Sequence, residues 1–132
     1  MRNRGSVVIV ENNSVVLIKR IRDGSVYYVF PGGTIEEGEN PETGAIREAF
    51  EELGVKVSIN ECLGKLEFNG TQYFFMAEII GGLLGTGKGE EYNVNRNRGI
   101  YLPMWVDIEK LSNLDVKPQE IALKVQALFK VK

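Results

Sequence analysis

Residues 40–54, NPETGAIREAFEELG, carry signals for both ends of one helix. Asn40 suits the N-cap, Pro41 suits the first helical position, and Gly54 suits the C-terminal stop. On a helical wheel with about 100° per residue, three carboxylates gather on one face: those of Glu48, Glu51 and Glu52. The opposite, core-facing stripe consists of Ile46, Ala49, Phe50 and Leu53. The segment therefore predicts an amphipathic helix with one strongly acidic face.

The acidic face of this helix is either ordinary solvated surface or the binding site of a positive partner. Like charges three and four residues apart cost a few tenths of a kcal/mol per pair, and residues 32–54 contain one cation, Arg47. Arg47 lies beside Glu51 on the wheel and can orient its carboxylate. The chain has no histidine and one cysteine, so we expect any metal here to be a hard, oxygen-bound cation: Mg²⁺, Mn²⁺ or Ca²⁺. Gly44 lies on the acidic face one turn earlier, and the space it leaves is expected to admit a metal, water or phosphate.

The spacing upstream of the helix matches a known pattern. Gly33 is followed after five residues by Glu39, and after seven more by REAFEELGV, residues 47–55. The Nudix box reads glycine, five residues, glutamate, seven residues, then Arg-Glu-aliphatic-any-Glu-Glu-any-Gly-aliphatic. Every fixed position of that pattern matches over residues 33–55. The preceding run Phe30-Pro31-Gly32-Gly33 also resembles the family's usual lead into the box, so the chain resembles the Nudix (MutT-like) hydrolases.

The resemblance implies a metal site built from the helix. It makes the acidic stripe the ligand set for Mg²⁺, with Mn²⁺ as the alternative: Glu48, Glu51 and Glu52. The backbone carbonyl of Gly33, or of its neighbour Gly32, would complete the shell. Both glycines would also lie against the bound substrate.

Further box residues would support this site. The resemblance implies that Arg47 orients a glutamate, that Glu39 supports the loop positioning the helix, and that Gly54 ends the helix. Family members take the general base either from the box helix or from a later loop. Both options stay open for this chain, and the candidates are Glu52, Glu90 and Glu91.

Weaker signals concern the substrate. Arg20, with Lys19, ends a strand and can reach a phosphate, whereas Arg96 and Arg98 can hold a distal phosphate; surface charge explains these residues equally well. Several aromatic side chains can stack on a nucleobase, although most are expected in the core: Tyr27, Tyr28, Phe30, Tyr73, Tyr101 and Trp105. Tyr73 lies eighteen residues after Val55, about where the family places a tyrosine for dinucleoside polyphosphates.

The resemblance also implies an activity. Nudix enzymes use a divalent metal and an activated water to hydrolyse a diphosphate linkage in a nucleotide substrate. The expected substrate is a (d)NTP or related nucleoside polyphosphate, with which the compact size is compatible. ADP-ribose, nucleotide sugars and dinucleoside polyphosphates remain alternatives. A nucleotide-sensing Nudix module without turnover belongs to another class, and such domains commonly lose box glutamates that this chain keeps. A Ca²⁺-binding or purely structural domain is disfavoured because no EF-hand spacing is present.

Composition sets limits that agree with this interpretation. The 132 residues predict a single domain, 1–132, and the 43% hydrophobic content is that of a globular protein. The net charge of -2 gives no support for binding a nucleic-acid polymer. The apolar runs are too short to span a membrane, and no signal peptide is visible, so a cytoplasmic location is expected. A small nucleotide is the expected partner, a homodimer stays open, and Cys62 is expected to be buried.

Strand signals surround the helix. GSVVIV and VVLIKR, separated by ENNS, predict a hairpin, and VYYVF predicts a strand that Pro31-Gly32-Gly33 stops. KLEF and TQYFFMAEII flank Asn69-Gly70, a strong hairpin signal, and YLPMWV predicts the last strand. Residues 81–99 predict a long exposed loop. Residues 118–131 predict a second helix with an apolar face of Ile121, Val125, Leu128 and Phe129. The expected fold is α+β, an αβα sandwich with a mixed β-sheet between helices.

Overall fold

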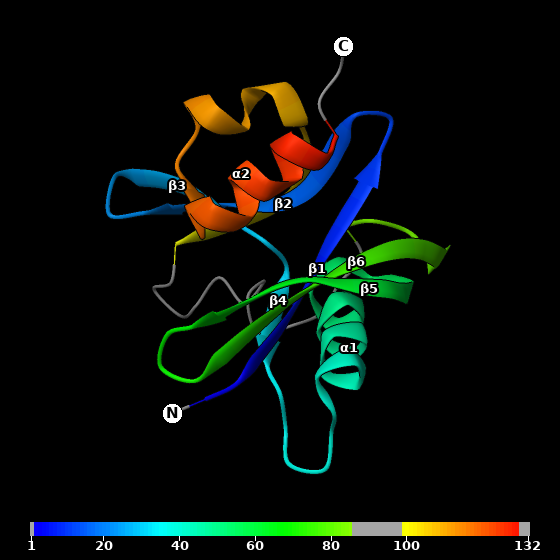
Figure 1. Ribbon diagram of the computed structural model, residues 1–132. Helices are drawn as coiled ribbons and strands as arrows, with labels where there is room; N and C mark the ends of the chain where they lie inside the picture. The colour runs from blue at the N-terminus through cyan, green and yellow to red at the C-terminus, as the bar shows by residue number, and fades with distance from the viewer. Residues whose placement is uncertain (1, 86–98, 130–132) are drawn as a thin grey trace.

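The computed structural model describes residues 2–85 and 99–129, and Figure 1 shows their arrangement. The helices are α1 (Pro41–Leu53), the 3₁₀ helix η3 (Ile108–Asn113) and α2 (Gln119–Leu128). The strands are β1 (Arg4–Glu11), β2 (Ser14–Arg22), β3 (Ser25–Val29), β4 (Gly32–Thr34), β5 (Val55–Glu67), β6 (Thr71–Gly82), β7 (Ile100–Asp107) and β8 (Val116–Lys117).

The strands form one mixed sheet with helices on both faces. Its order is β5-β6-β1-β2-β3-β8, with β4 also pairing to β1 and β7 to β2. β1 runs parallel to β6 and antiparallel to β4. Alternate residues of β1 enter different cores: Val8 packs in the cluster that contains α2, while Val7 and Ile9 pack in the cluster that contains α1. The α+β fold with a mixed sheet between helices is confirmed, and α1 and α2 lie on opposite sides in Figure 1.

The ends of α1 follow the sequence signals. The side chain of Asn40 accepts a hydrogen bond from Thr43 N at 2.8 Å, and Gly54 takes the left-handed conformation, φ 80°, that a helix-ending glycine favours. The backbone N–H of Gly54 donates a hydrogen bond to the carbonyl of Phe50 and so completes the last turn of the helix. These two caps set the helix length and therefore the position of its glutamates.

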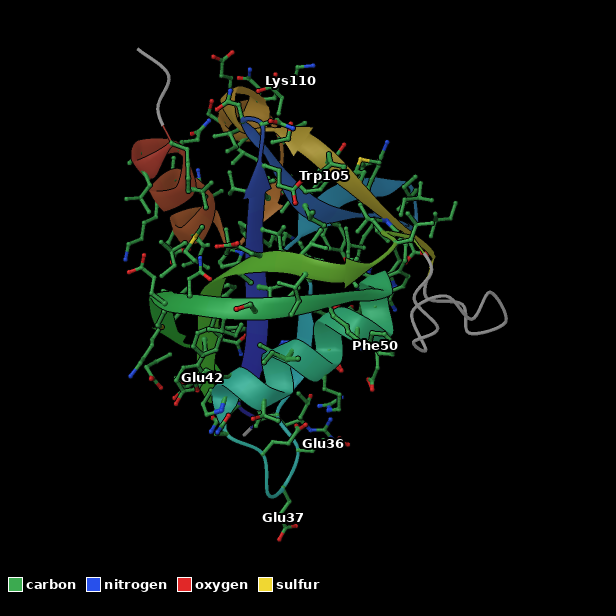
Figure 2. The ribbon with its side chains drawn as sticks, turned by 90° about the vertical axis from the view of Figure 1, so that its right-hand side faces the viewer. Glu36, Glu37, Glu42, Phe50, Trp105 and Lys110 are labelled. Carbon is green, nitrogen blue, oxygen red and sulfur yellow. The ribbon has the colours of Figure 1, made fainter. Side chains whose placement is uncertain are left out.

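The buried face of α1 differs from the predicted one. Ile46 and Phe50 were expected in the core, but they are 38% and 53% exposed, and Phe50 projects from the outer side of the helix in Figure 2. The side chains that face the sheet are Ala45, Ala49 and Leu53. The helix approaches β1 so closely that a Cβ at Gly5 would lie 2.9 Å from the carbonyl oxygen of Pro41. Small side chains permit this approach, and the orientation of the helix also buries Glu52, which is 5% exposed.

The expected stop at Pro31-Gly32-Gly33 is confirmed, because β3 ends at Val29. Gly32 and Gly33 then form β4 and pair with Ser6 and Gly5 of β1. Two further expectations about burial are wrong. Cys62 is exposed. The register of β5 shifts between Ile59 and Glu61 and between Cys62 and Gly64, so Leu63 enters the core instead. On α2 the prediction holds for Ile121 and Val125, but Leu128 is 59% exposed and Ala122 takes the buried position.

Part of the predicted loop lies outside the described residues. Gly81 and Gly82 end β6, and Ile100 begins β7. The candidates Glu90, Glu91, Arg96 and Arg98 all fall within residues 86–98, which are not described. Within the described part of the chain, no helix is long and apolar enough to cross a membrane.

Candidate active site

Three acidic residues of α1, Glu48, Glu51 and Glu52, line one pocket beside β4. The pocket has a volume of about 760 Å³. Its charged lining consists of Arg2, Arg4, Arg20, Glu36, Arg47, Glu48, Glu51 and Glu52, and Gly32, Gly33, Thr34, Val29, Phe30 and Tyr101 complete it. We call it the carboxylate pocket. The predicted metal ligands, the two glycines and Arg20 are thus brought together.

Glu52 joins α1 to β4. Its Oε1 accepts a hydrogen bond from the backbone N–H of Gly32 at 2.6 Å, in buried surroundings. A buried carboxylate is costly unless it is paired or hydrogen-bonded. The bond to Gly32 therefore explains how a glutamate with 5% exposure remains at the pocket wall.

Glu48 lies directly over Gly33. A Cβ built on Gly33 would overlap the carboxylate of Glu48, meeting Oε1 at 2.6 Å and Oε2 and Cδ closer still. The space that a side chain would fill is therefore occupied by the glutamate. Gly33 is required here because of this close approach, and the approach brings the Glu48 carboxylate against the backbone of β4.

Arg47 binds to the carboxylates that surround it. Its Nη1 donates to Glu51 Oε1 at 3.0 Å and to Glu48 Oε1 at 3.2 Å, and its Nη2 donates to the carbonyl of Thr34 at 2.9 Å. Its Nε lies 2.7 Å from Glu39 Oε2 and 3.2 Å from Glu36 Oε1. The hydrogen bond to Glu39, followed by those to Glu51, raises the pKa of Arg47 above its ordinary value despite partial burial. The guanidinium is permanently charged and fixes two of the candidate metal ligands.

Glu39 ties the loop before α1 to the helix. Its Oε1 accepts the backbone N–H of Glu36 at 2.8 Å, and both of its oxygens accept hydrogen bonds from Arg47. The hydrogen bond from Arg47 and the backbone hydrogen bond from Glu36 hold the pKa of the Glu39 carboxyl below its usual range. A neutral Glu39 would make these hydrogen bonds without its negative charge, so they are weaker in the neutral form and the charged form stabilises the loop more.

This linkage predicts a pH-dependent stability. Because the folded-state pKa of Glu39 is lowered, its contribution is present above its unfolded pKa of about 4.3 and is lost as the pH falls through the folded value. We expect Glu39→Gln to lower the melting temperature by roughly 4 °C at pH 7, as expected for loss of one charged hydrogen bond. The difference from wild type should shrink below about pH 4.

The measurement is thermal unfolding of both proteins between pH 3 and pH 8. Glu37→Gln is the matched control, since Glu37 belongs to the same loop but is exposed and points outward at its tip in Figure 2. A melting-temperature difference for Glu39→Gln that stays constant across the pH range would contradict the linkage.

The space beside Gly44 is filled by the same loop. A Cβ at Gly44 would lie 3.2 Å from Ile35 Cγ1 and 3.3 Å from Glu39 Oε1. The expectation that this space admits a metal, water or phosphate is therefore wrong. Gly44 lets the loop pack onto the helix, which in turn brings Glu39 within reach of Arg47.

The residues of the carboxylate pocket fit a hard divalent cation by their chemistry. The atoms that can bind a metal are carboxylate and carbonyl oxygens, which Mg²⁺ and Mn²⁺ prefer as ligands. The close approach of Glu48 to Gly33 also brings one carboxylate against a strand backbone. Among the described residues, however, no three acidic, histidine or cysteine side chains converge as a ready-made metal cage. Glu48 and Glu51 are held by Arg47, and Glu52 is held by Gly32.

The other predicted substrate residues are placed unequally. Arg20 lines the carboxylate pocket, and its guanidinium lies 3.9 Å from the ring centroid of Tyr101. Tyr73 instead stacks on Phe75 at a centroid distance of 6.1 Å and packs beside the core under α1. It does not belong to the described lining of the carboxylate pocket.

Sequence reasoning missed Arg2 and Arg4 as pocket residues. Both lie in the opening MRNRG, where the sequence shows only basic residues ahead of an apolar run. The place of Arg4 follows from β1 pairing with β4 and β6, with Arg4 opposite Thr34 on one side and Gln72 on the other, and Arg2 donates its backbone N–H to the carbonyl of Asn69. Such long-range pairing leaves no local sequence signal.

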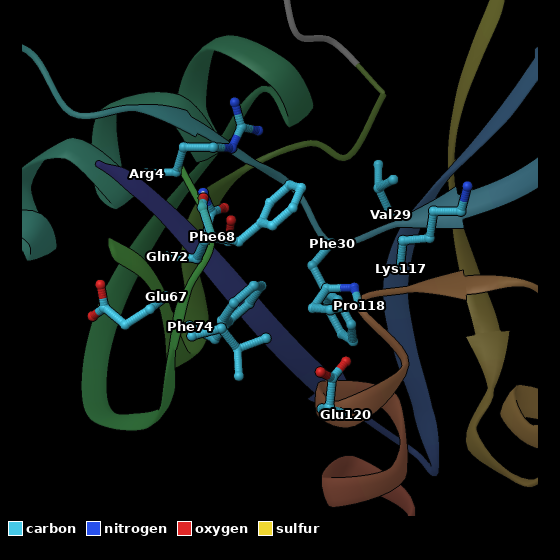
Figure 3. A pocket seen from close by; sticks show the side chains of 12 residues that line it. Arg4, Val29, Phe30, Glu67, Phe68, Gln72, Phe74, Lys117, Pro118 and Glu120 are labelled. Carbon is cyan, nitrogen blue, oxygen red and sulfur yellow. The ribbon is translucent and has the colours of Figure 1, made fainter. Parts of the chain in front are cut away.

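A second, more apolar pocket adjoins the first. It has a volume of about 510 Å³, and Figure 3 shows its lining. Three phenylalanines lie in its wall: Phe30 and Phe74, which are 4% exposed, and Phe68, which is 72% exposed. Its polar lining consists of Arg4, Ser6, Glu67, Gln72, Lys117 and Glu120. We call it the aromatic pocket. Arg4, Val29 and Phe30 line both pockets, so the two share a wall.

A known protein family and curated relatives match this chain. A family model described as a NUDIX domain matches residues 1–124. An ADP-sugar pyrophosphatase of Mus musculus is 44% identical over 55 residues, 40% of this chain and 25% of that protein. A putative 8-oxo-dGTP diphosphatase of Bacillus subtilis is 34% identical over 87 residues, 62% of this chain and 57% of that protein. Both matches span less than two thirds of the relative's length.

The fold also matches a solved structure. A NUDIX hydrolase from Nitrosomonas europaea has a TM-score of 0.76 at 18% identity, with 96% of this chain and 87% of that chain covered. The box at residues 33–55, the sandwich around it and the family match over residues 1–124 agree with one another. The chain belongs to the Nudix family.

Proposed function

We propose that the chain is a metal-dependent hydrolase that cleaves a diphosphate linkage in a nucleotide substrate. The observation that carries this proposal is the shared wall between the carboxylate pocket and the aromatic pocket. A nucleotide has the same two parts, a flat apolar base and a chain of phosphates that binds metal. The exposed ring of Phe68 suits the first part by stacking, and carboxylates that hold a cation suit the second.

The carboxylates of α1 would hold the metal. Glu48, Glu51 and Glu52 are the proposed ligands for Mg²⁺, or for Mn²⁺, with a backbone oxygen of Gly32 or Gly33. Once bound, such an ion neutralises phosphate charge, orients the diphosphate and lowers the pKa of coordinated water. Arg47 keeps the carboxylates of Glu48 and Glu51 in place through its hydrogen bonds. Arg20 lines the same pocket and is proposed to contact a phosphate.

The general base that accepts the proton of water is proposed to be a glutamate. Glu52 is the candidate in α1, and its anchor on Gly32 N would keep the carboxylate aimed at the pocket. Glu90 and Glu91 are the candidates in the segment between β6 and β7. Their single Gln variants distinguish these options, since removal of the base should lower kcat more than it raises KM.

The proposed substrate is a (d)NTP or a related nucleoside polyphosphate. The relative named as a putative 8-oxo-dGTP diphosphatase supports this class. The relative named as an ADP-sugar pyrophosphatase supports the alternative of ADP-ribose or a nucleotide sugar. The aromatic pocket is compatible with both, because both classes contain a nucleobase next to a diphosphate.

A substrate panel tests this proposal. It includes (d)NTPs, 8-oxo-dGTP, ADP-ribose, nucleotide sugars and dinucleoside polyphosphates, each incubated with Mg²⁺ or with EDTA, and the products are separated by chromatography. We expect cleavage of at least one compound in Mg²⁺ and none in EDTA. Cleavage that persists in EDTA would contradict metal dependence, and tight nucleotide binding without turnover would favour a nucleotide-sensing module.

A further inference from the structure

We propose that Arg4 binds the phosphate group that is attached to the nucleoside, and so couples recognition in the aromatic pocket to placement of the diphosphate. This inference rests on the proposed function, because it assumes a nucleotide that occupies both pockets. It assigns a substrate contact to a residue outside the box. Four observations carry it.

The first observation is the position of Arg4. It lies on the wall that the carboxylate pocket shares with the aromatic pocket. In Figure 3, Arg4 lies above Phe68 and Phe74, and Glu120 lies below them. A nucleotide with its base among the rings and its diphosphate near the carboxylates would place its nucleoside-linked phosphate at this wall.

The second observation is the state of the guanidinium. Within the described residues, Arg4 makes one side-chain hydrogen bond, from Nη2 to the carbonyl of Gly32 at 3.5 Å, and no ion pair. A guanidinium has five N–H donors, so most of its donors have no protein acceptor in this part of the chain. Arg47, in the same pocket, is the opposite case because four glutamates and a carbonyl surround it. The N–H donors of Arg47 are used by protein acceptors, whereas Arg4 has N–H donors that can bind a ligand.

The third observation is the rigidity of its backbone. Arg4 is paired with Thr34 of β4 on one side and with Gln72 of β6 on the other. An arginine at the start of a strand that is paired on both sides presents its planar fork from a fixed base, and this geometry suits bidentate binding of a phosphate.

The fourth observation links Arg4 to the carboxylates. Its one hydrogen bond goes to the carbonyl of Gly32, and the N–H of Gly32 donates to Glu52 at 2.6 Å. The arginine that would bind the phosphate and the glutamate that anchors α1 to β4 are therefore linked through a single residue, Gly32. Gly32 therefore contacts both the side chain that would bind the nucleoside-linked phosphate and the side chain that holds the acidic helix in place.

Equilibrium binding tests the proposal without turnover. Calorimetry would measure the Kd of a nucleoside and of its 5′-monophosphate in Mg²⁺, for wild type and Arg4→Gln, using the base that wild type binds best. We expect Arg4→Gln to reduce the preference for the monophosphate about tenfold, as expected for loss of one charged hydrogen bond. The Kd of the free nucleoside should stay within about twofold. Arg4→Lys should retain part of the preference, because it keeps the charge but not the fork.

The control is Arg22→Gln, since Arg22 is exposed at the end of β2 and lines neither pocket; it should leave the preference for the monophosphate unchanged. Equal weakening of nucleoside and monophosphate by Arg4→Gln would assign Arg4 a structural role through Gly32, and an unchanged preference would remove it from the site. Either result overturns the inference while leaving the hydrolase intact. Failure of wild type to bind any nucleoside or monophosphate would instead overturn the proposed nucleotide function, and the inference with it.

Discussion

Glu52→Gln is expected to lower kcat for the best substrate by about 10²–10⁴-fold. Glutamine has nearly the same shape, and its amide oxygen can still accept the hydrogen bond from Gly32 N that Glu52 accepts at 2.6 Å. The fold should therefore persist, with a melting temperature close to that of wild type. The loss would come from removing one negative charge at the proposed metal site, together with any role of the carboxylate as base.

Steady-state kinetics and thermal unfolding of the same preparation check this result. Glu42→Gln is the matched control, because Glu42 is exposed in the first turn of the same helix and lies away from the pocket lining. It should leave kcat unchanged. If Glu52→Gln kept more than a tenth of wild-type kcat, the carboxylate of Glu52 would be neither base nor essential ligand. Glu91→Gln and Glu90→Gln would then become the decisive variants.

Alanine at Gly33 and at Gly32 should damage different properties. At Gly33 the added Cβ meets the flexible end of Glu48, whereas at Gly32 it meets backbone, lying 2.5 Å from Gly5 O and 2.6 Å from Ser6 Cα. A carboxylate can move aside, but two paired strands cannot. We therefore expect Gly33→Ala to fold, and to lose activity or metal affinity about 10–100-fold, the range seen when supporting contacts of metal ligands are removed.

Gly32→Ala should instead destabilise the fold by about 1–3 kcal/mol, the usual cost of overpacking. The two effects are separated by a Mg²⁺ titration of activity and by thermal unfolding of each variant. Full activity in Gly33→Ala would show that the position of Glu48 over Gly33 is not required. A Gly32→Ala variant as stable as Gly33→Ala would show that β4 can shift away from β1.

The parts of the site that local sequence could predict are those encoded by short spacing. Asn40 and Gly54 determine the ends of α1, and the helical period then brings Glu48, Glu51 and Glu52 to one side. Arg47 and Glu51 meet because they are one turn apart. The supporting role of Glu39 was implied by the family pattern rather than by periodicity, whereas its bond to Arg47 was not predicted, since it depends on the path of the loop at Ile35.

The parts that could not be predicted depend on how elements pack. A wheel separates polar from apolar faces, but it does not show which apolar residues meet the sheet, and the close approach of α1 to Gly5 selects Ala45 and Ala49 over Phe50. Cys62 is exposed because irregularities in β5 shift the alternation of its side chains. Arg4 entered the pocket through pairing with residues 34 and 72, and no pattern near residue 4 reports such distant partners.

The pairing of β1 also has a consequence for synthesis of the chain. β1 finds its antiparallel partners β2 and β4 within the first 34 residues, but its parallel partner β6 begins at Thr71. Until the ribosome has released that segment, one edge of a strongly apolar strand, Val7 to Ile9, has no neighbour to complete its hydrogen bonds. Open strand edges of this kind invite pairing with other chains. A nascent or truncated chain that ends before β6 therefore exposes an aggregation-prone edge that the finished protein closes.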